Sequence, residues 1–407
     1  MKKYLVLAAG CVALILLTPP TQARIKLNTL PERERVEIQL DHPNVTLIQE
    51  ERIVPLVAGV NQVDFSWANT AIDPETILFQ VLEGDAPDAR GERKPIEDAA
   101  EGVKVLSVSY PPNEAALVWQ VAAETSGPAR VRISYILGNL DKSFNYRAVA
   151  ANDEKTLELR QYIRVQNLAN EEFGDTQLWA GFGEGFHKPI GLNETKEMLM
   201  SRHAKVPIRK TYTAAVAEHG YLDEPQKKLR IPMHYVIQNN TQSGLGDAAL
   251  PFGKVRIFQD DGRGTTAFLG EDWGRFTPVD DEMKLALGVA QDIVVRRTIE
   301  KNEQHRVAGN LFNIELIVKY EIENFKDTPV TLDVAERLPA LRDEFFRPTG
   351  RPVEWELGAE TTFPGGPDKE ESTFDNLLFH AELPAKGKDG KAEKIVHKLH
   401  ITLKNEW

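Results

Sequence analysis

The chain has 407 residues, a formal net charge of −12 and a single cysteine, Cys11. The surplus of acidic residues repels nucleic acid and anionic membrane surfaces, so we expect no nucleic-acid partner. Cys11 lies in a segment whose cleavage we predict below, so we expect the mature protein to have no disulfide and no cysteine-ligated metal site. The length is ample for one large or two ordinary hydrophobic cores.

The first residues have the order of a secretory signal peptide. Lys2 and Lys3 precede an apolar run, Tyr4–Leu17, and a helix-breaking stretch then ends at Ala23. The run is too short to span a bilayer comfortably. We therefore predict a signal peptide at residues 1–23, export to the periplasm or the extracellular space, and no transmembrane segment.

A bacterial lipoprotein signal is a second interpretation of the same segment. Ala8–Cys11 resembles a lipoprotein cleavage box, which would leave a lipid on Cys11. The apolar run before Cys11 is very short, however, and it continues to Leu17. A single lipid chain also binds membranes weakly. We therefore rank lipid anchoring at Cys11 below cleavage after Ala23.

Period-two alternation of apolar and polar side chains dominates the rest of the chain. It is clearest at residues 312–322, which predicts a long strand with one buried face. The turn-forming stretch 326–329 and renewed alternation at 330–334 predict that these two strands form a hairpin. The same pattern predicts further strands at 63–67, 77–81, 131–135, 157–165, 255–257 and 395–403.

Many short strands separated by glycine and proline turns are typical of antiparallel β-sandwiches. Helical pattern is scarce. Residues 195–204 could form a short helix, but the run continues into Val206–Ile208 and favours a strand. The predicted fold class is therefore all-β, with antiparallel β-sandwich modules, two in number, and little helix.

A small polar stretch at residues 148–153 separates two strand-rich regions. It predicts an N-terminal β domain at 24–150 and a C-terminal β-sandwich domain at 151–407. Two further polar stretches, 365–372 and 386–393, are expected to be loops.

The second half of the chain carries strand-and-turn motifs in a recognisable order. They are Gly244-Leu245-Gly246, Leu250–Phe258, Phe268–Asp272, Leu285–Gly288, Asp292–Val295, Glu323-Asn324, Pro329–Leu332 and Glu336–Pro339. In this order they resemble domain of unknown function 4139, a family of exported, mucoidy-inhibitor-like bacterial proteins. The resemblance covers roughly Val131 to the C-terminus and, more weakly, residues 45–81.

This resemblance implies a β-sandwich fold. The family offers no agreed catalytic residue, so none is carried over to this chain. Two features depart from the family: the coiled-coil insert of longer members is missing, and Phe144-Asn145-Tyr146 stands where a tryptophan-containing motif is often found. An interaction that uses those features is not implied here.

Five aspartates lie in predicted turns that are close in sequence: Asp260, Asp261, Asp272, Asp280 and Asp281. Calcium binds several converging oxygens of this kind. Their spacing matches no calcium loop, however, and aspartate is a common turn residue. We expect turn-forming residues rather than a metal site.

The nine histidines show no His-Glu-x-x-His spacing. His397 and His400 are three apart on a predicted strand and so should face opposite sides, with His397 in the core. A convergent site remains open for four histidines of the middle third: His187, His203, His219 and His234. The glycine-rich stretch 181–186 lacks the following helix of a phosphate-binding loop, which predicts a bulged strand or turn.

Catalytic motifs are equally scarce. No Gly-x-Ser-x-Gly nucleophile motif occurs. The tryptophans could form a sugar platform, but most are expected in the core or half-buried on strands; they are Trp67, Trp119, Trp179, Trp273, Trp355 and Trp407. We therefore predict no catalytic, cofactor-binding or metal residues, and no cofactor.

Two hypotheses about function follow. The first is a non-enzymatic cell-envelope binding or structural module, which binds another envelope protein or a polysaccharide through loops or an open sheet edge. The alternative is a hydrolase acting on envelope polysaccharide or peptide. A hydrolase should show a concave pocket with converging ionisable groups, and a binding module need not.

Overall fold

The computed structural model describes residues 27–40, 42, 44–82, 96–174, 176–179, 185–346 and 350–406. The predicted signal peptide, with Cys11, lies outside these residues. Strands make up 59% of the structure and helices 5%, so the predicted all-β fold is confirmed. Within the described ranges, no helix is long and apolar enough to cross a membrane.

The chain divides into two compact units that are discontinuous in sequence. One takes in the residues up to Lys142 together with Val165–Lys196, and the other comprises Ser143–Arg164 and Glu197 onwards. The chain crosses between the units inside three strands, which are β9 (Leu140–Ala150), β10 (Thr156–Asn167) and β13 (Thr195–Ala215). The expected boundary at 148–153 falls at the end of β9 and in the turn to β10.

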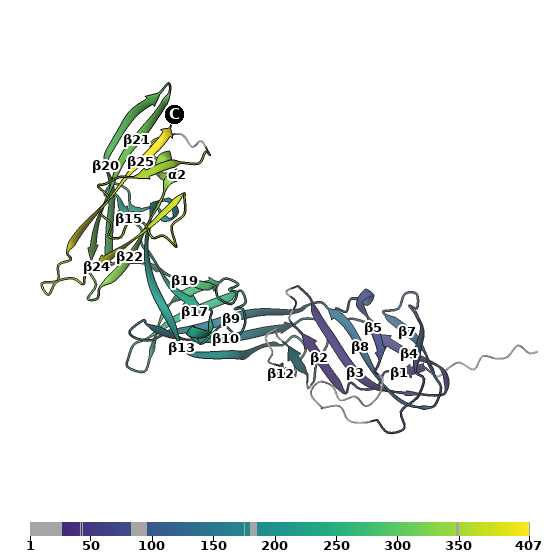
Figure 1. The fold of residues 1–407 in the computed structure, drawn as a ribbon. Coiled ribbons are helices and arrows are strands. Elements are labelled where there is room, and N and C mark those ends of the chain that lie inside the picture. Colours follow the sequence, from purple (N-terminus) through teal and green to yellow (C-terminus); the bar gives the residue numbers. More distant parts are fainter. Residues whose placement is uncertain are drawn as a thin grey trace, which may run out of the picture. The chain divides into compact units, whose positions relative to one another are not determined.

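The described part of the first unit is built around two sheets (Figure 1). The first has the strand order β1 (Leu27–Thr29), β4 (Gly59–Ser66), β7 (Ala116–Ala123), β6 (Lys104–Ser109). The second has the order β12 (Gly185–His187), β11 (Gln177–Trp179), β2 (Arg35–Gln39), β3 (Thr46–Leu56), β8 (Gly127–Leu137), β5 (Leu78–Val81), and a short 3₁₀ helix, η1 (Pro74–Thr76), precedes β5. Rings from the two sheets meet: Phe65 lies 5.9 Å from Tyr135, and Phe79 lies 4.5 Å from Trp119, between centroids.

The second unit begins with a curved sheet to which β9, β10 and β13 contribute. The other strands are β16 (Pro232–Gln238), β17 (Gly253–Asp260), β18 (Thr266–Gly274) and β19 (Glu282–Val289), and the order is β18-β17-β9-β10-β13-β16-β19. A 3₁₀ helix, η2 (Thr241–Ser243), follows β16. The end strands β18 and β19 contact each other, so the sheet nearly closes around its own core.

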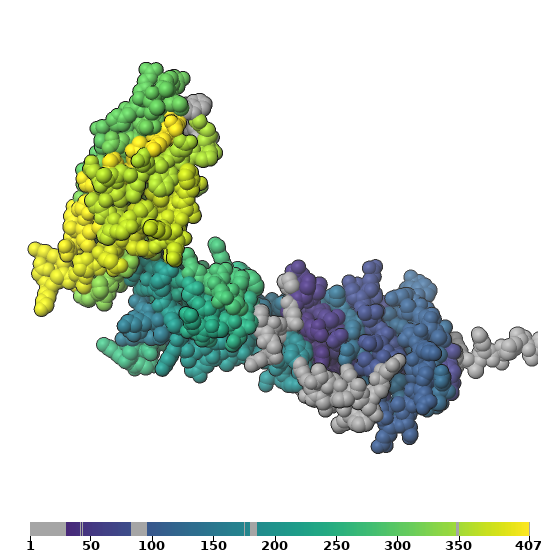
Figure 2. Space-filling model, in the orientation of Figure 1, coloured from purple at the N-terminus to yellow at the C-terminus, as the bar shows by residue number. Residues whose placement is uncertain are grey.

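The same unit contains a second core, between another sheet and a facing strand pair. The sheet has the order β14 (Tyr221–Asp223), β15 (Lys228–Leu229), β20 (Ile293–Ala308), β21 (Leu311–Asn324), β25 (Lys394–Glu406), β23 (Glu354–Leu357). The facing pair is β22 (Val330–Arg337) and β24 (Asn376–Leu383), with the short helices α1 (Val216–His219) and α2 (Leu338–Asp343). Residues 365–372 and 386–393 are loops, as expected, and Figure 2 shows the latter standing out from the surface in yellow.

The predicted hairpin between residues 312–322 and 330–334 is wrong. β21 pairs with β20 and β25, whereas β22 pairs with β24 and, in parallel, with the end of β13. The turn between them carries the chain across the core to the facing layer, where Leu332 and Val334 share one apolar cluster with Val318 and Tyr320. Alternation tells which face of a strand is buried, but two such faces can meet across a core as well as side by side.

A buried ion pair joins the two layers of this second core. Arg297 of β20 donates two hydrogen bonds to the carboxylate of Glu336 on β22, at 2.9 and 3.0 Å. Both side chains are 1% exposed. Glu344 accepts from the same guanidinium at 2.8 Å, and the Tyr320 hydroxyl donates to Glu336. Such a pair is fully hydrogen-bonded, which is the condition under which charges tolerate burial.

We expect Arg297→Met to lower the free energy of unfolding by about 3–5 kcal/mol, because it leaves the Glu336 carboxylate buried without a counter-charge. Arg297→Met/Glu336→Gln removes both charges and keeps an acceptor for Tyr320, so it should cost less. Urea unfolding measures both. Lys404→Ala is the control, because Lys404 and its partner Glu356 are both exposed at the surface, and it should cost about 1 kcal/mol or less. A double variant as unstable as the single one would contradict this account.

Candidate functional site

The outer surface of β17 and β18 combines exposed aromatic rings with cations. Along β17, Val255 and Ile257 point into the core of the nearly closed sheet, so their neighbours point outward. We call this surface the aromatic–basic face; its residues are Arg147, Phe252, Lys254, Arg256, Phe258, Phe268, Glu271 and Trp273.

A β-bulge in β18 gathers the aromatic rings on this one face. Phe268 and Trp273 are five residues apart and would lie on opposite faces of a regular strand. The pairing shifts by one residue beside Gly270, so that Trp273 faces Lys254 and Phe268 faces Phe258. The extra residue returns both rings to the outer face.

The rings form two contacting pairs. Phe252 and Trp273 stack in parallel, with centroids 5.1 Å apart and an interplanar angle of 3°. Phe258 and Phe268 lie 5.4 Å apart at a tilt. Phe252, Trp273 and Phe268 are each more than half exposed. Large aromatic side chains normally lose most of their surface to the core, so this concentration marks a surface that another molecule can cover.

Three cations lie among these rings. Lys254 sits over the Trp273 ring at 5.3 Å and pairs with Glu271, while the Arg147 guanidinium lies 4.9 Å from the Phe258 centroid. Arg147 and Arg256 are direct neighbours in the parallel register of β9 and β17, and both are exposed. Arg256 is also in register with Glu271 on β18, but the carboxylate of Glu271 forms its ion pair with Lys254. Like charges opposite each other on adjacent strands are destabilising, and an anion placed between them relieves the repulsion.

A polar groove of about 690 Å³ lies elsewhere in the second unit, where the end of β13 runs beside β22. Its lining includes Arg209, Lys210, Lys326, Asp333, Glu371 and His380. The volume is within the range of small-molecule sites. This is the concave arrangement of ionisable groups that the hydrolase hypothesis requires.

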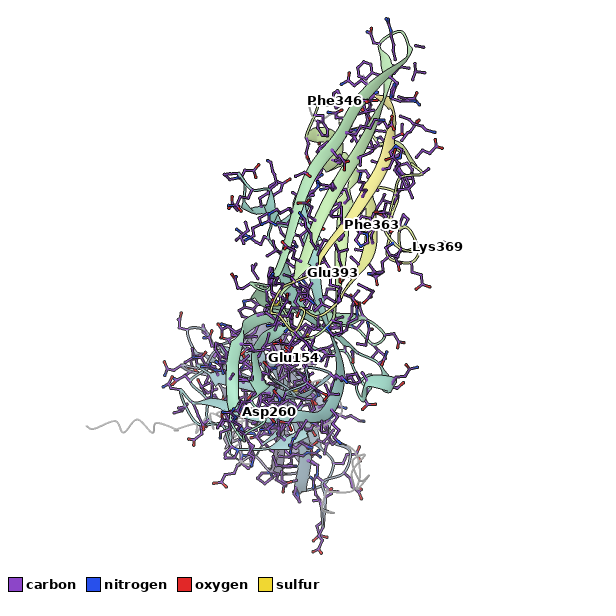
Figure 3. All side chains as sticks on the ribbon, turned by 90° about the vertical axis from the view of Figure 1, so that its left-hand side faces the viewer. Glu154, Asp260, Phe346, Phe363, Lys369 and Glu393 are labelled. Carbon is purple, nitrogen blue, oxygen red and sulfur yellow. The ribbon has the colours of Figure 1, made fainter. Side chains whose placement is uncertain are left out.

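His380 is the titratable centre of the groove. It is in register with Asp333 on β22, and its Nδ1 lies 2.9 Å from the Asp333 carboxylate. Its Nε2 lies 3.3 Å from Asp368, in the loop where Figure 3 labels Lys369. Burial acts to lower the pKa of His380, but the two carboxylates outweigh it and the pKa is raised above its ordinary value. A carboxylate acceptor at each nitrogen favours the imidazolium form, which has no lone pair free to act as a base.

The five aspartates of the predicted turns do not converge. Asp260, labelled in Figure 3, accepts from the Gly262 amide, and Asp261 accepts from the amides of Arg263 and Thr265. Asp272 lies within β18, whereas its position in the sequence predicts a turn, and it accepts from the Ala286 amide on β19; Asp281 accepts from the Glu282 amide. No group of three potential metal ligands within the described ranges includes any of them.

No such group in the described part of the chain includes a histidine of the middle third. His397 is in register with Tyr320 on the core side, and its ring stacks on Phe363 at 4.8 Å. Burial lowers its pKa, and its Nδ1 has no partner among the described residues. His400 is in register with Ile317 instead and meets Glu315. Residues 181–184 of the glycine-rich stretch lie outside the described residues.

Among the tryptophans, Trp119 is buried, whereas Trp273 is 52% exposed on the aromatic–basic face. Trp407 lies outside the described residues. The sequence distinguishes Trp273 from the other five tryptophans by no motif, because the β-bulge that places it on the same face as Phe268 depends on strand pairing. In comparisons with known proteins, no family model and no curated protein matches the chain. The resemblance to domain of unknown function 4139 therefore stays a prediction.

We expect His380→Gln to destabilise the protein more at about pH 5.5 than at about pH 8.5. A group whose pKa is raised by folding contributes stability below its unfolded pKa, and this contribution is lost as the pH rises through its folded pKa. Urea unfolding at both pH values measures the difference. His219→Gln is the control, because His219 lies 3.7 Å from a single carboxylate, that of Glu218. A cost for His380→Gln that is equal at both pH values would contradict the doubly paired imidazolium.

Proposed function

We propose that this protein is an exported, non-enzymatic binding module of the cell envelope, and that its aromatic–basic face binds an acidic polysaccharide. The observation that carries the proposal is the register pairing of Arg147 with Arg256 beside exposed, stacked aromatic rings. Two neighbouring guanidinium groups, which together with Lys254 share the carboxylate of Glu271 on this face, favour an anionic ligand, and exposed rings favour one with apolar faces.

Acidic sugars have both properties. The faces of a pyranose ring carry C–H groups, which are attracted to the electron-rich face of an aromatic ring. Its carboxylate accepts paired hydrogen bonds from a guanidinium, and a lysine adds a point charge. A chain of such sugars presents both features along its length, as the face does from Phe252 to Phe258, where Lys254 and Arg256 lie between the two rings.

The acidic character of the whole protein narrows the choice of ligand. A net charge of −12 disfavours nucleic acid, whose dense phosphates bind through extended basic surfaces. The cations of the aromatic–basic face are few and stand beside Glu271. This arrangement suits a polymer with spaced, single charges that also contributes contacts from its rings.

A hydrolase is the second candidate, and the polar groove is the observation that favours it. The groove offers concavity and converging ionisable groups. We rank it lower because both nitrogens of His380 face carboxylates, which favour the protonated ring over the neutral form that a general base requires. Release of reducing ends or peptides from envelope polymers by the wild type, abolished in His380→Ala, would favour the hydrolase instead.

We propose export on the signal peptide at residues 1–23, with the protein in the periplasm or outside the cell. The mass of the mature protein tests this, because cleavage after Ala23 and lipidation at Cys11 give different N-termini. Membership of the family of domain of unknown function 4139 is proposed on the motifs alone.

Trp273→Ala should weaken binding to polygalacturonic acid about threefold to tenfold, the effect expected for loss of one aromatic contact. Arg256→Gln should weaken it and reduce its dependence on salt, because one charge contact is lost. Titration calorimetry of the full mature protein measures both.

Phe374→Ala is the matched control, because Phe374 is 60% exposed but lies beside Trp355 of β23, at 6.4 Å between ring centroids. Its affinity should equal that of the wild type, and neutral dextran should bind more weakly than the polyuronate. Equal binding by Trp273→Ala and the wild type would contradict the proposed face.

A further inference from the structure

A second cluster of chemically active side chains lies on the outer face of the β20–β21 hairpin, which Figure 1 shows in green beside β25. Glu303 and His305 are two apart on β20 and therefore share a face. Glu315 of β21 is in register with Glu303. One ligand atom from each of the three lies within 4.8 Å of the others, the one such group found in the described ranges.

His400 on β25 orients one of these carboxylates. Its Nδ1 accepts a hydrogen bond from the Glu360 amide at 3.2 Å, so the ring carries its proton on Nε2. That Nε2 donates to Glu315 Oε1 at 2.9 Å. The second oxygen of Glu315, Oε2, then faces His305 Nε2 at 3.3 Å. A hydrogen-bonded partner that fixes a ligand in this way is a regular feature of metal sites.

A cation already occupies the space between the carboxylates. The Lys301 ammonium lies 2.8 Å from Glu315 Oε2 and 3.4 Å from Glu303 Oε2. It offsets the repulsion between two glutamates that stand opposite each other on adjacent strands. The ammonium therefore marks a position of negative potential, lined by two carboxylate oxygens and one imidazole nitrogen.

We propose that Glu303, His305 and Glu315 bind a zinc ion, with His400 holding Glu315 in place and Lys301 competing for the same position. Zinc accepts nitrogen and carboxylate ligands in a tetrahedral arrangement, and water completes the fourth position. The one imidazole ligand separates this site from those of calcium and magnesium, which take oxygen ligands. The ion would join β20 to β21 and is independent of the aromatic–basic face.

The competition by Lys301 supplies the sharpest test. Zinc chloride is titrated calorimetrically into the full mature protein and into variants, with circular dichroism confirming the fold of each. His305→Ala and Glu315→Gln should weaken zinc binding at least about tenfold, since each removes one ligand. Lys301→Gln should tighten it, because it removes the competing charge and no ligand. A structural role alone would not produce a variant that binds more tightly.

Cobalt provides a second readout, because tetrahedral coordination gives it a visible absorption band. The band should appear in the wild type, strengthen in Lys301→Gln and vanish in Glu315→Gln. His219→Ala removes a histidine that lies beside one glutamate only and should leave zinc affinity unchanged. The proposal is overturned if neither the wild type nor Lys301→Gln binds zinc saturably, or if His305→Ala and Glu315→Gln bind as the wild type does.

Discussion

The buried pair of Arg297 and Glu336 is the constraint on which the second core depends. The two charges lie on opposite layers, so the layers can pack only where the guanidinium and the carboxylate meet. A shift of one residue in either strand would expose one charged side chain and leave the other buried in the apolar core without its partner. The cost would be comparable with the stability of a domain. The pair therefore fixes β22 opposite β20, and with it the polar groove beside β22.

Once the inner faces are fixed, the outer faces follow from strand geometry. Each residue between two core positions must point to solvent, and register decides what stands beside it. This places Arg256 beside Arg147 and Glu303 beside Glu315. Both pairings oppose like charges, which does not stabilise the sheet. Aromatic rings surround the Arg147–Arg256 pair, whereas imidazoles and an ammonium surround the Glu303–Glu315 pair. Each pair therefore marks a chemically distinct surface.

The difference between what could and could not be predicted from sequence lies in pairing. The alternation of apolar and polar residues correctly predicted strands where the structure has β10, β17, β21 and β25, because burial of one face is a local property of a strand. It could not predict that β22 crosses the core instead of pairing with β21. The parallel contact of β9 with β17 joins residues about a hundred positions apart, and the bulge beside Gly270 depends on that sheet. Hence neither the aromatic–basic face nor the Glu303–His305–Glu315 cluster was visible as a motif.

The charge of the whole protein also shapes how the aromatic–basic face can bind a polyanion. At low ionic strength the net charge of −12 repels such a polymer from a distance, while the local cations attract it at contact. Added salt screens the distant repulsion first, because that repulsion acts beyond the Debye length of about 8–10 Å. The affinity for the polyanion should then fall less steeply with salt than it does for a basic protein. Salt affects the contacts of the stacked rings little, so these contacts would contribute a larger share of the binding free energy.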